Sequence, residues 1–265
     1  MYHVIGCCLL LASLPTAAQV TVDTMRASGQ SYFDSETETL IRVYRDHYTL
    51  SHPDSANAKT FPATGISKWL TNHSVHLLKE KLTLVKSGSG PVYQVTNGTI
   101  TRIDHALDHE FQHYAVEFVH NDTLFRHGGY GLWEAHNFLT WFSFTTMEWE
   151  ILRPITGPDF PPGLLRHHAV VNNEELYLYG GYTIDPWNRL KRVPNLEVWK
   201  FNFNNRQWTN LGIINPKLAA VDWDYWPWQF NGAPQRYYRK DQWMIRIDPA
   251  NNQLDYFLQD PALVY

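Results

Sequence analysis

Cysteine is almost absent from this sequence: Cys7 and Cys8 are the only two in 265 residues. Both lie in an apolar run over 4–14, which small residues follow, and this pattern predicts a secretory signal segment cleaved after Ala18. Its removal leaves a mature chain without cysteine. Disulfides, thiolate nucleophiles and cysteine-ligated metal centres are then excluded. We therefore expect a secreted or periplasmic protein; the alternative is a buried amino-terminal strand, since no Lys or Arg precedes the run.

An excess of positive charge is also lacking, because 22 Lys and Arg face 26 Asp and Glu, for a net charge of −4. This balance excludes nucleic-acid binding driven by bulk charge. Apolar runs of roughly 20 residues, the length that spans a bilayer, are missing as well, so we expect no membrane-spanning segment. Aromatic residues, by contrast, are abundant: 11 Trp, 15 Tyr and 13 Phe lie in short segments separated by turn residues. The composition favours an ordered, aromatic-rich β protein.

A repeat emerges from spacing. The segments 124–130 and 176–182 share an apolar strand pattern that ends in a glycine pair, Gly128-Gly129 in the first and Gly180-Gly181 in the second. Each segment follows an apolar run that begins at histidine, with Asn-rich turn residues between. The pattern predicts strand, tight turn, strand and glycine corner, twice in order.

A second feature recurs downstream of each glycine pair. Phe142 and Trp149 are seven residues apart, as are Phe201 and Trp208, and the segment 247–254 repeats the spacing. Polar turn residues separate the members of each pair, which predicts a third strand, a hairpin loop and a fourth strand. Four short antiparallel strands in about 50 residues is the period of a propeller blade.

These residues resemble the kelch repeat, most directly over 113–211, and the whole resembles exported kelch proteins of Bacteroidetes-type bacteria. The resemblance implies an all-β fold, a kelch-type β-propeller of four-stranded antiparallel blades. We expect a signal peptide over 1–18 and an irregular segment over 19–66 with one strand, at 38–50. The propeller would fill 67–265, with blades near 67–104, 113–152, 165–211 and 217–258.

The number of blades leaves two alternatives open, because closed propellers use four to eight. Either four or five blades close imperfectly, or this is a shortened version of a longer propeller. The sequence stops soon after a fourth-strand pattern, which favours the second alternative.

One motif suggests metal chemistry. His109-Glu110-Phe111-Gln112-His113 has the HExxH form, which on a helix would bind zinc and make the protein a zinc peptidase. In the repeat alignment, however, His113 begins the first strand of a blade, and strand geometry does not bring both imidazoles to one metal. We therefore predict a polar connection between blades, with no metal site.

The sequence lacks the residues that redox chemistry and several other enzyme chemistries require. The kelch resemblance includes galactose oxidase, whose central domain is such a propeller, but its copper chemistry implies a Cys–Tyr crosslink that a cysteine-free mature chain cannot form. A GxSxG elbow, a P-loop and a GxGxxG fingerprint are absent too. We expect no cofactor.

Three segments could contact a ligand. The segment 223–230 contains five aromatic residues, including Trp226 and Trp228, that could stack on sugar rings or a peptide, although packing between blades is the simpler interpretation. The loop over 182–194, with Trp187 and Arg189, is longer than a hairpin needs. Around the first glycine pair, the candidates for lining a central channel are His127, Tyr130 and His136.

The sequence thus predicts a non-catalytic binding or sensing module that presents propeller loops to a protein or glycan ligand. The alternative is a periplasmic carbohydrate-active enzyme, such as a sugar epimerase or mutarotase. That alternative requires titratable residues from several blades to converge at the channel mouth.

Overall fold

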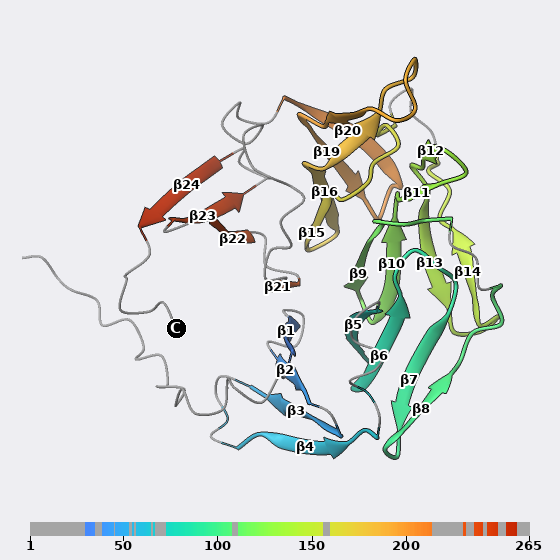
Figure 1. The fold of residues 1–265 in the computed structure, drawn as a ribbon, viewed down its shortest axis with the longest axis vertical. Helices are drawn as coiled ribbons and strands as arrows, with labels where there is room; N and C mark the ends of the chain where they lie inside the picture. The colour runs from blue at the N-terminus through green and yellow to red at the C-terminus, as the bar shows by residue number, and fades with distance from the viewer. Residues whose placement is uncertain are drawn as a thin grey trace, which may run out of the picture.

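The computed structural model describes residues 30–34, 39–44, 46–52, 55, 57–64, 66, 73–107, 111–155, 160–213, 230–231, 236–240, 243–248 and 253–258. These residues form an all-β fold of mostly antiparallel sheets (Figure 1). Within them, no sheet closes on itself, and no helix has the length and hydropathy to cross a lipid bilayer.

The first sheet contains β1 (Gln30–Asp34), β2 (Thr39–Val43), β3 (His47–Ser51) and β4 (Lys59–Pro62). The short β21 (Phe230–Asn231) pairs with β1 in parallel, so a late segment of the chain joins the earliest strand. The expectation of a single strand over 38–50 is wrong. Two antiparallel strands cover this stretch, and the backbone amide of Tyr44 donates to the carbonyl of His47 at the turn between them.

Three further sheets are four-stranded meanders in which each strand pairs with the one before it. The second contains β5 (His73–Leu78), β6 (Lys81–Lys86), β7 (Val92–Thr96) and β8 (Thr99–Arg102). The third contains β9 (Val116–His120), β10 (Thr123–His127), β13 (Leu139–Ser143) and β14 (Glu148–Ile151). The fourth contains β15 (His168–Asn172), β16 (Glu175–Tyr179), β19 (Glu197–Asn202) and β20 (Gln207–Ile213).

The seven-residue spacings correspond to cross-strand partners. Phe142 pairs with Trp149 between β13 and β14, and Phe201 pairs with Trp208 between β19 and β20. In a separate three-stranded sheet of β22 (Arg236–Lys240), β23 (Trp243–Asp248) and β24 (Gln253–Leu258), Ile247 is paired in register with Leu254. Two residues that pair across a short hairpin loop fix the register of its strands. Each of these hairpins therefore has the register that the seven-residue spacing predicts.

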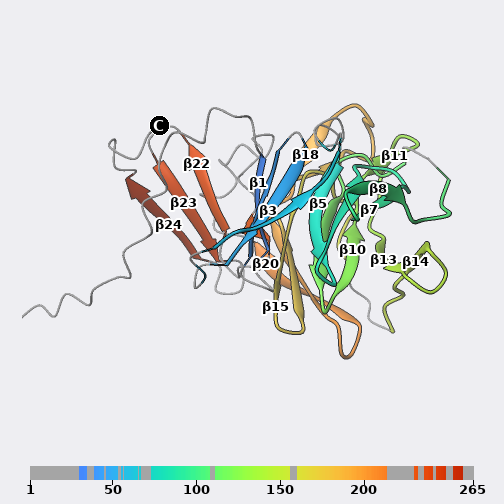
Figure 2. The ribbon, with the colours of Figure 1, turned by 90° about the horizontal axis from the view of Figure 1, so that it is seen from below.

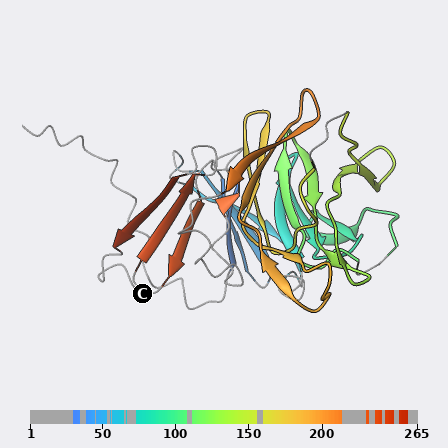
Figure 3. The same cartoon turned by 90° about the horizontal axis from the view of Figure 1, so that it is seen from above.

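The sheets follow one another around the molecule, with their first strands toward its middle (Figure 1). Strand β1 contacts β5, β5 contacts β9, and β9 contacts β15. Views at right angles show these strands running across the thickness of the molecule, with β22–β24 at one side (Figures 2 and 3).

Three apolar clusters lie between successive sheets. One joins the first sheet to the second through residues such as Ile41 and Leu84, and another joins the second to the third through Val92 and Phe142. The last joins the third sheet to the fourth and includes Phe201. Successive side chains of a strand point to opposite faces of its sheet. Each middle sheet can therefore pack against a neighbouring sheet on both of its faces.

Candidate functional site

Two hairpins leave the meander sheets at equivalent places, between the second and third strands. In the third sheet the hairpin consists of β11 (Tyr130–Gly131) and β12 (Glu134–Ala135); in the fourth it consists of β17 (Tyr182–Ile184) and β18 (Arg192–Pro194). Each begins directly after a glycine pair of the repeat. Strand β12 contacts β17, so the two hairpins lie side by side (Figure 1).

The glycine corners fix where these hairpins start. Gly128 and Gly129 have φ angles of 73° and 99°, and Gly180 and Gly181 have 65° and 70°, in the left-handed region that glycine tolerates best. They are also closely packed: a Cβ on Gly129 would lie 2.7 Å from the backbone oxygen of Gln112. The corners therefore require glycine because of their backbone geometry.

The tips of the two hairpins expose four large apolar side chains, which we call the tip surface: Leu132, Trp133, Trp187 and Leu190. Their exposed fractions are 68%, 64%, 95% and 83%. An ion pair joins the two tips, with Arg189 Nη2 3.6 Å from Glu134 Oε1. Glu134 directly follows Trp133, and Arg189 directly precedes Leu190 in the chain. The ion pair is exposed and therefore weak, but it shows that the two tips lie close together, which places their apolar residues near one another.

The first tip is a strained turn. Leu132 and Trp133 are the two central residues between β11 and β12, and their φ angles are 52° and 67°. Positive φ at both positions is the geometry of a type I′ turn, which strongly prefers Asn-Gly. Bulky side chains cost about 1 kcal/mol or more each in this region. The fold therefore holds two large apolar side chains in solvent at a conformational cost.

The second tip is ordered by its own polar groups. Asp185 accepts hydrogen bonds from the backbone amides of Trp187 and Asn188, and its carboxylate lies 3.2 Å from Lys191 Nζ. These hydrogen bonds, with that of Lys191, lower the pKa of the Asp185 carboxyl. These contacts give the loop a defined structure. The loop therefore holds the backbone of Trp187 in place, although the Trp187 side chain is exposed to solvent.

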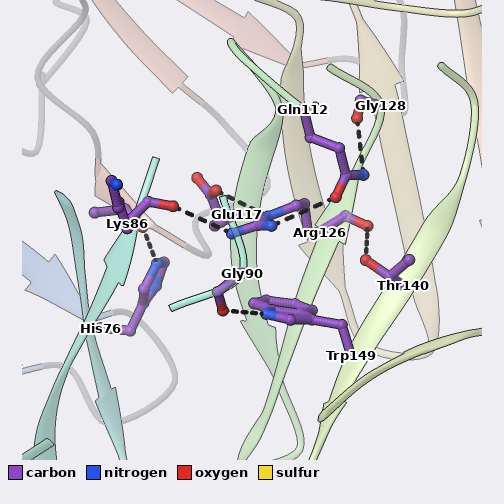
Figure 4. Close-up of polar contacts among 10 residues, drawn as sticks. His76, Lys86, Gly90, Gln112, Glu117, Arg126, Gly128, Thr140 and Trp149 are labelled. Carbon is purple, nitrogen blue, oxygen red and sulfur yellow. Dashed lines mark hydrogen bonds and ion pairs between the residues drawn. The ribbon is translucent and has the colours of Figure 1, made fainter. Parts of the chain in front are cut away.

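A second group of polar residues is buried between the second and third sheets (Figure 4). Arg126 on β10 is fully buried, and its Nε donates to Glu117 Oε1 on β9 at 3.1 Å. The guanidinium also donates to Gln112 Oε1 and to the backbone carbonyl of Lys86, and its carbon lies 4.2 Å from the centroid of the Trp149 ring. We call this set the Arg126 centre.

Burial decides the electrostatics of this centre. Burial raises the pKa of the Glu117 carboxyl, although the charge of Arg126 and the hydrogen bonds from Arg126 and Ser74 act to lower it. It also lowers the pKa of the Arg126 guanidinium, which Glu117 opposes. His76, whose Nε2 lies 3.0 Å from Ser74 Oγ, has its pKa lowered to about 3 by burial and by the charge of Arg126.

The register of the repeat shows that the architecture does not require these charges. Glu117 and Arg126 are cross-strand partners four residues from their hairpin turn. In the sheet before, the same positions hold Val75 and Leu84, and in the sheet after they hold Ala169 and Leu178. A buried ion pair is weak evidence for stability, because desolvation offsets the Coulombic gain. The pair therefore distinguishes the third sheet from its neighbours.

Buried histidines lie between the third and fourth sheets. His127 Nδ1 and His167 Nε2 are 2.9 Å apart, and the His127 ring packs edge-on against Trp208. Burial lowers the pKa of His127 to about 3, so the ring is neutral at physiological pH. Its Nε2 has no hydrogen-bond partner among the described residues. The part of the chain that is described holds no group of three or more His, Cys, Asp or Glu arranged for a metal ion.

The neutral, buried His127 predicts a pH dependence of stability. Between pH 3 and about 6.5, the unfolded chain binds a proton at His127 that the folded chain does not, so this residue makes stability rise with pH. We expect His127→Gln to reduce the slope of unfolding free energy against pH by about 1 kcal/mol per unit between pH 4 and 6. Urea titrations at several pH values measure the slope. An unchanged slope would contradict a neutral, buried His127.

The structure separates the residues that the sequence singles out. His127 is fully buried, so we remove it from the ligand-contacting candidates. Tyr130 is half-buried on β11, and His136 is half-buried and stacked on Phe138. Trp187 and Arg189 lie at the second tip, whereas Trp226 and Trp228 lie outside the described residues.

The HExxH segment is described only in part, since His109 and Glu110 lie outside the described residues. His113 forms an antiparallel β-bridge with Tyr130, so its backbone is extended rather than helical. This bridge leads directly into the first hairpin. The described part of the motif therefore connects two sheets and supports the tip.

Sequence reasoning missed Leu132 and Trp133, and it also missed the Arg126 centre. For the centre a signal was present, because an offset of 52 residues aligns Glu117 with Ala169 and Arg126 with Leu178. Charges at apolar repeat positions indicate a local specialisation.

Comparison with known proteins does not assign a family. A scan against models of protein families finds no match, and a search of curated proteins finds no similar sequence.

Proposed function

We propose that this chain is a kelch-type β-propeller, exported by its first 18 residues, that acts as a binding module for a protein or glycan. The propeller is supported by four successive, mostly antiparallel sheets, whose first strands contact one another in chain order. Glycine corners and aromatic pairs at equivalent places support a repeated blade. An incomplete or imperfectly closed ring of four to five blades accommodates the observed sheets.

The observation that carries the binding function is the strained, exposed turn at Leu132 and Trp133. Left-handed geometry also occurs at turns to which we assign no binding role, such as that of Lys79 and Glu80, so it is the combination of this geometry with two exposed apolar side chains that indicates a functional site. A hairpin on a rigid sheet can present a tryptophan with little loss of entropy on binding. The ion pair between Glu134 and Arg189 adds Trp187 to the same surface.

Burial favours binding over catalysis. Glu117 is 8% exposed and Arg126 is fully buried, so this ion pair has no access to a substrate. The tip surface, by contrast, presents apolar groups and charged groups to solvent. We therefore propose recognition at the tips, with the Arg126 centre in a supporting role.

A turn exchange tests this proposal. Leu132→Asn with Trp133→Gly gives the first tip the residues that a type I′ turn prefers, so we expect unfolding free energy to rise by about 1 to 2 kcal/mol. The same change removes two apolar contacts, so binding on glycan and peptide arrays should fall more than about tenfold. Thermal or urea unfolding measures the first effect, and array fluorescence measures the second.

A matched control exists in the turn between β5 and β6. Lys79 and Glu80 also have positive φ, at 48° and 61°. Lys79→Asn with Glu80→Gly should give a similar gain of stability and leave binding unchanged. Equal binding by both variants and the unaltered chain would contradict recognition at the tip.

A further inference from the structure

The connection that enters the third sheet runs along the hairpin of the first tip. His113 and Tyr130 exchange backbone hydrogen bonds of 2.9 and 2.7 Å, so the segment 111–113 lies beside β11 as a further extended element. A Cβ on Gly131 would overlap the backbone of Phe111, which shows how closely the two backbones approach. Because closely packed groups transmit displacement, a shift of this segment moves the hairpin with it.

One side chain of the segment joins the hairpin to the Arg126 centre (Figure 4). Gln112 Oε1 accepts a hydrogen bond from Arg126 Nη1 at 3.4 Å, and Gln112 Nε2 donates to the backbone carbonyl of Gly128 at 3.2 Å. That carbonyl belongs to the glycine corner from which β11 starts. A single amide thus links the buried ion pair of Arg126 and Glu117 to the base of the first tip.

The fourth sheet supplies a donor to the same corner position. The carbonyl of Gly180, which is equivalent to Gly128, accepts a hydrogen bond of 3.1 Å from the side-chain amide of Asn195. Both glycines are buried, and a buried carbonyl that lacks a donor is costly. The donor follows the hairpin in the fourth sheet, whereas in the third sheet it precedes the hairpin and is also bonded to Arg126.

The repeat replaces the whole linked set at once. The polar set of the third sheet is Gln112, Glu117 and Arg126, and an offset of 52 residues aligns it with three apolar residues of the fourth sheet, Leu164, Ala169 and Leu178. The two tips differ as well. The loop of Trp187 is ordered by its own contacts with Asp185, whereas the turn at Leu132 and Trp133 has two residues, both with positive φ. The polar set therefore belongs to the sheet whose tip is a strained two-residue turn.

We propose that Gln112 is a positioning residue for the first tip, through which the Arg126 centre imposes the strained turn on Leu132 and Trp133. Strained backbone persists where the surrounding structure over-determines it. The ion pair fixes the guanidinium, the guanidinium orients the Gln112 amide, and the amide holds the corner from which the hairpin starts. This inference rests on the proposed binding function and adds to it the device that keeps the binding tip in place.

Two variants test the inference. Gln112→Leu removes both side-chain hydrogen bonds and installs the residue that the fourth sheet carries at the equivalent position. A triple variant, Gln112→Leu with Glu117→Ala and Arg126→Leu, installs the whole apolar set. Because it removes both buried charges together, it should keep most of the stability of the unaltered chain. The triple variant thus separates a loosened tip from a damaged fold.

Hydrogen exchange and array binding are the two measurements. In both variants, the backbone amides of Tyr130 and His136, which donate within the hairpin and its corner, should exchange at least about tenfold faster than in the unaltered chain. The amides of the fourth sheet should exchange at an unchanged rate. Members of glycan and peptide arrays that lose binding in Trp133→Ala should bind both variants about fivefold to tenfold more weakly, because the tip residues are present but less preorganised.

Thr140→Val is the matched control. The Thr140 hydroxyl is buried in the same sheet and donates to the backbone carbonyl of Arg126 at 3.3 Å, so its loss also removes a buried hydrogen bond beside the centre. The Gln112 amide stays in place in this variant. We therefore expect hairpin exchange and array binding to match those of the unaltered chain.

The outcomes separate this inference from the proposed function. If hairpin exchange or array binding in Gln112→Leu matches that of Thr140→Val, the inference is overturned, and the proposed function stands because Trp133→Ala still loses binding. If the change occurs in Gln112→Leu and not in the triple variant, an unpaired guanidinium causes it, and the inference is overturned as well. If no array member depends on Trp133, the proposed function fails, and hydrogen exchange alone decides whether Gln112 holds the hairpin.

Discussion

Replacement of Arg126 by leucine should destabilise the protein by about 3 to 5 kcal/mol, and the further replacement of Glu117 by alanine should recover most of that loss. The single substitution leaves the Glu117 carboxylate buried without its guanidinium. The double substitution installs the pair that the next sheet already carries at the same register, Ala169 opposite Leu178. Because the backbone accommodates that pair next door, the new side chains should fit.

A double-mutant cycle measures this coupling. We expect Glu117→Ala and Arg126→Leu each to be strongly destabilising. Because the double variant should lose less than either single variant, the interaction energy should be about 3 kcal/mol or more, at or above the upper end of that found for contacting residues. Some loss should remain in the double variant, because Gln112 loses a donor and Trp149 loses the stacked guanidinium. Additive losses in urea unfolding would mean that the two residues act independently.

The second large effect concerns the glycine corner. Gly129→Ala should destabilise by about 3 kcal/mol or more, and Gly212→Ala by only about 1 kcal/mol. The φ angles are similar, 99° and 91°, so the left-handed strain is matched. They differ in space: a Cβ on Gly129 meets the backbone of Gln112 at 2.7 Å, whereas nothing lies within 4 Å of one on Gly212.

The difference in stability between the two alanine variants therefore gives the cost of the steric overlap at Gly129, separated from the cost of the left-handed backbone. Differential scanning calorimetry gives both values under the same conditions. The larger loss at Gly129 would show that the corner is defined by close approach of the connection that contains Gln112. Equal losses at the two glycines would show that backbone conformation alone decides the cost.

Local signals made part of this fold predictable. The pairing of Phe142 with Trp149, and of Phe201 with Trp208, follows from a loop length and a strand period that the sequence displays directly. The two strands β2 and β3 were predicted as one because the residues between them include a single turn-forming residue, Asp46, and neither Gly nor Asn.

The candidate site was less predictable, for physical reasons. Trp187 stood out because its loop is long, but Leu132 and Trp133 occupy a turn type that normally selects Asn-Gly, so turn chemistry argued against them. Their exposure, and the ion pair that unites the two tips, depend on how neighbouring sheets are placed. The prediction for His127 was wrong in the opposite sense. Its place beside a glycine corner suggested that it lines a central channel, whereas packing against Trp208 buries it.

The most direct test of recognition at the tip surface is array binding by the Leu132→Asn, Trp133→Gly variant, scored together with its stability. We expect a protein that unfolds at higher urea concentration than the unaltered chain and binds more than about tenfold more weakly. Such a dissociation separates ligand contact from folding, because a merely damaged protein would lose both. A variant that is more stable and binds as well as the unaltered chain would contradict recognition at the tip surface.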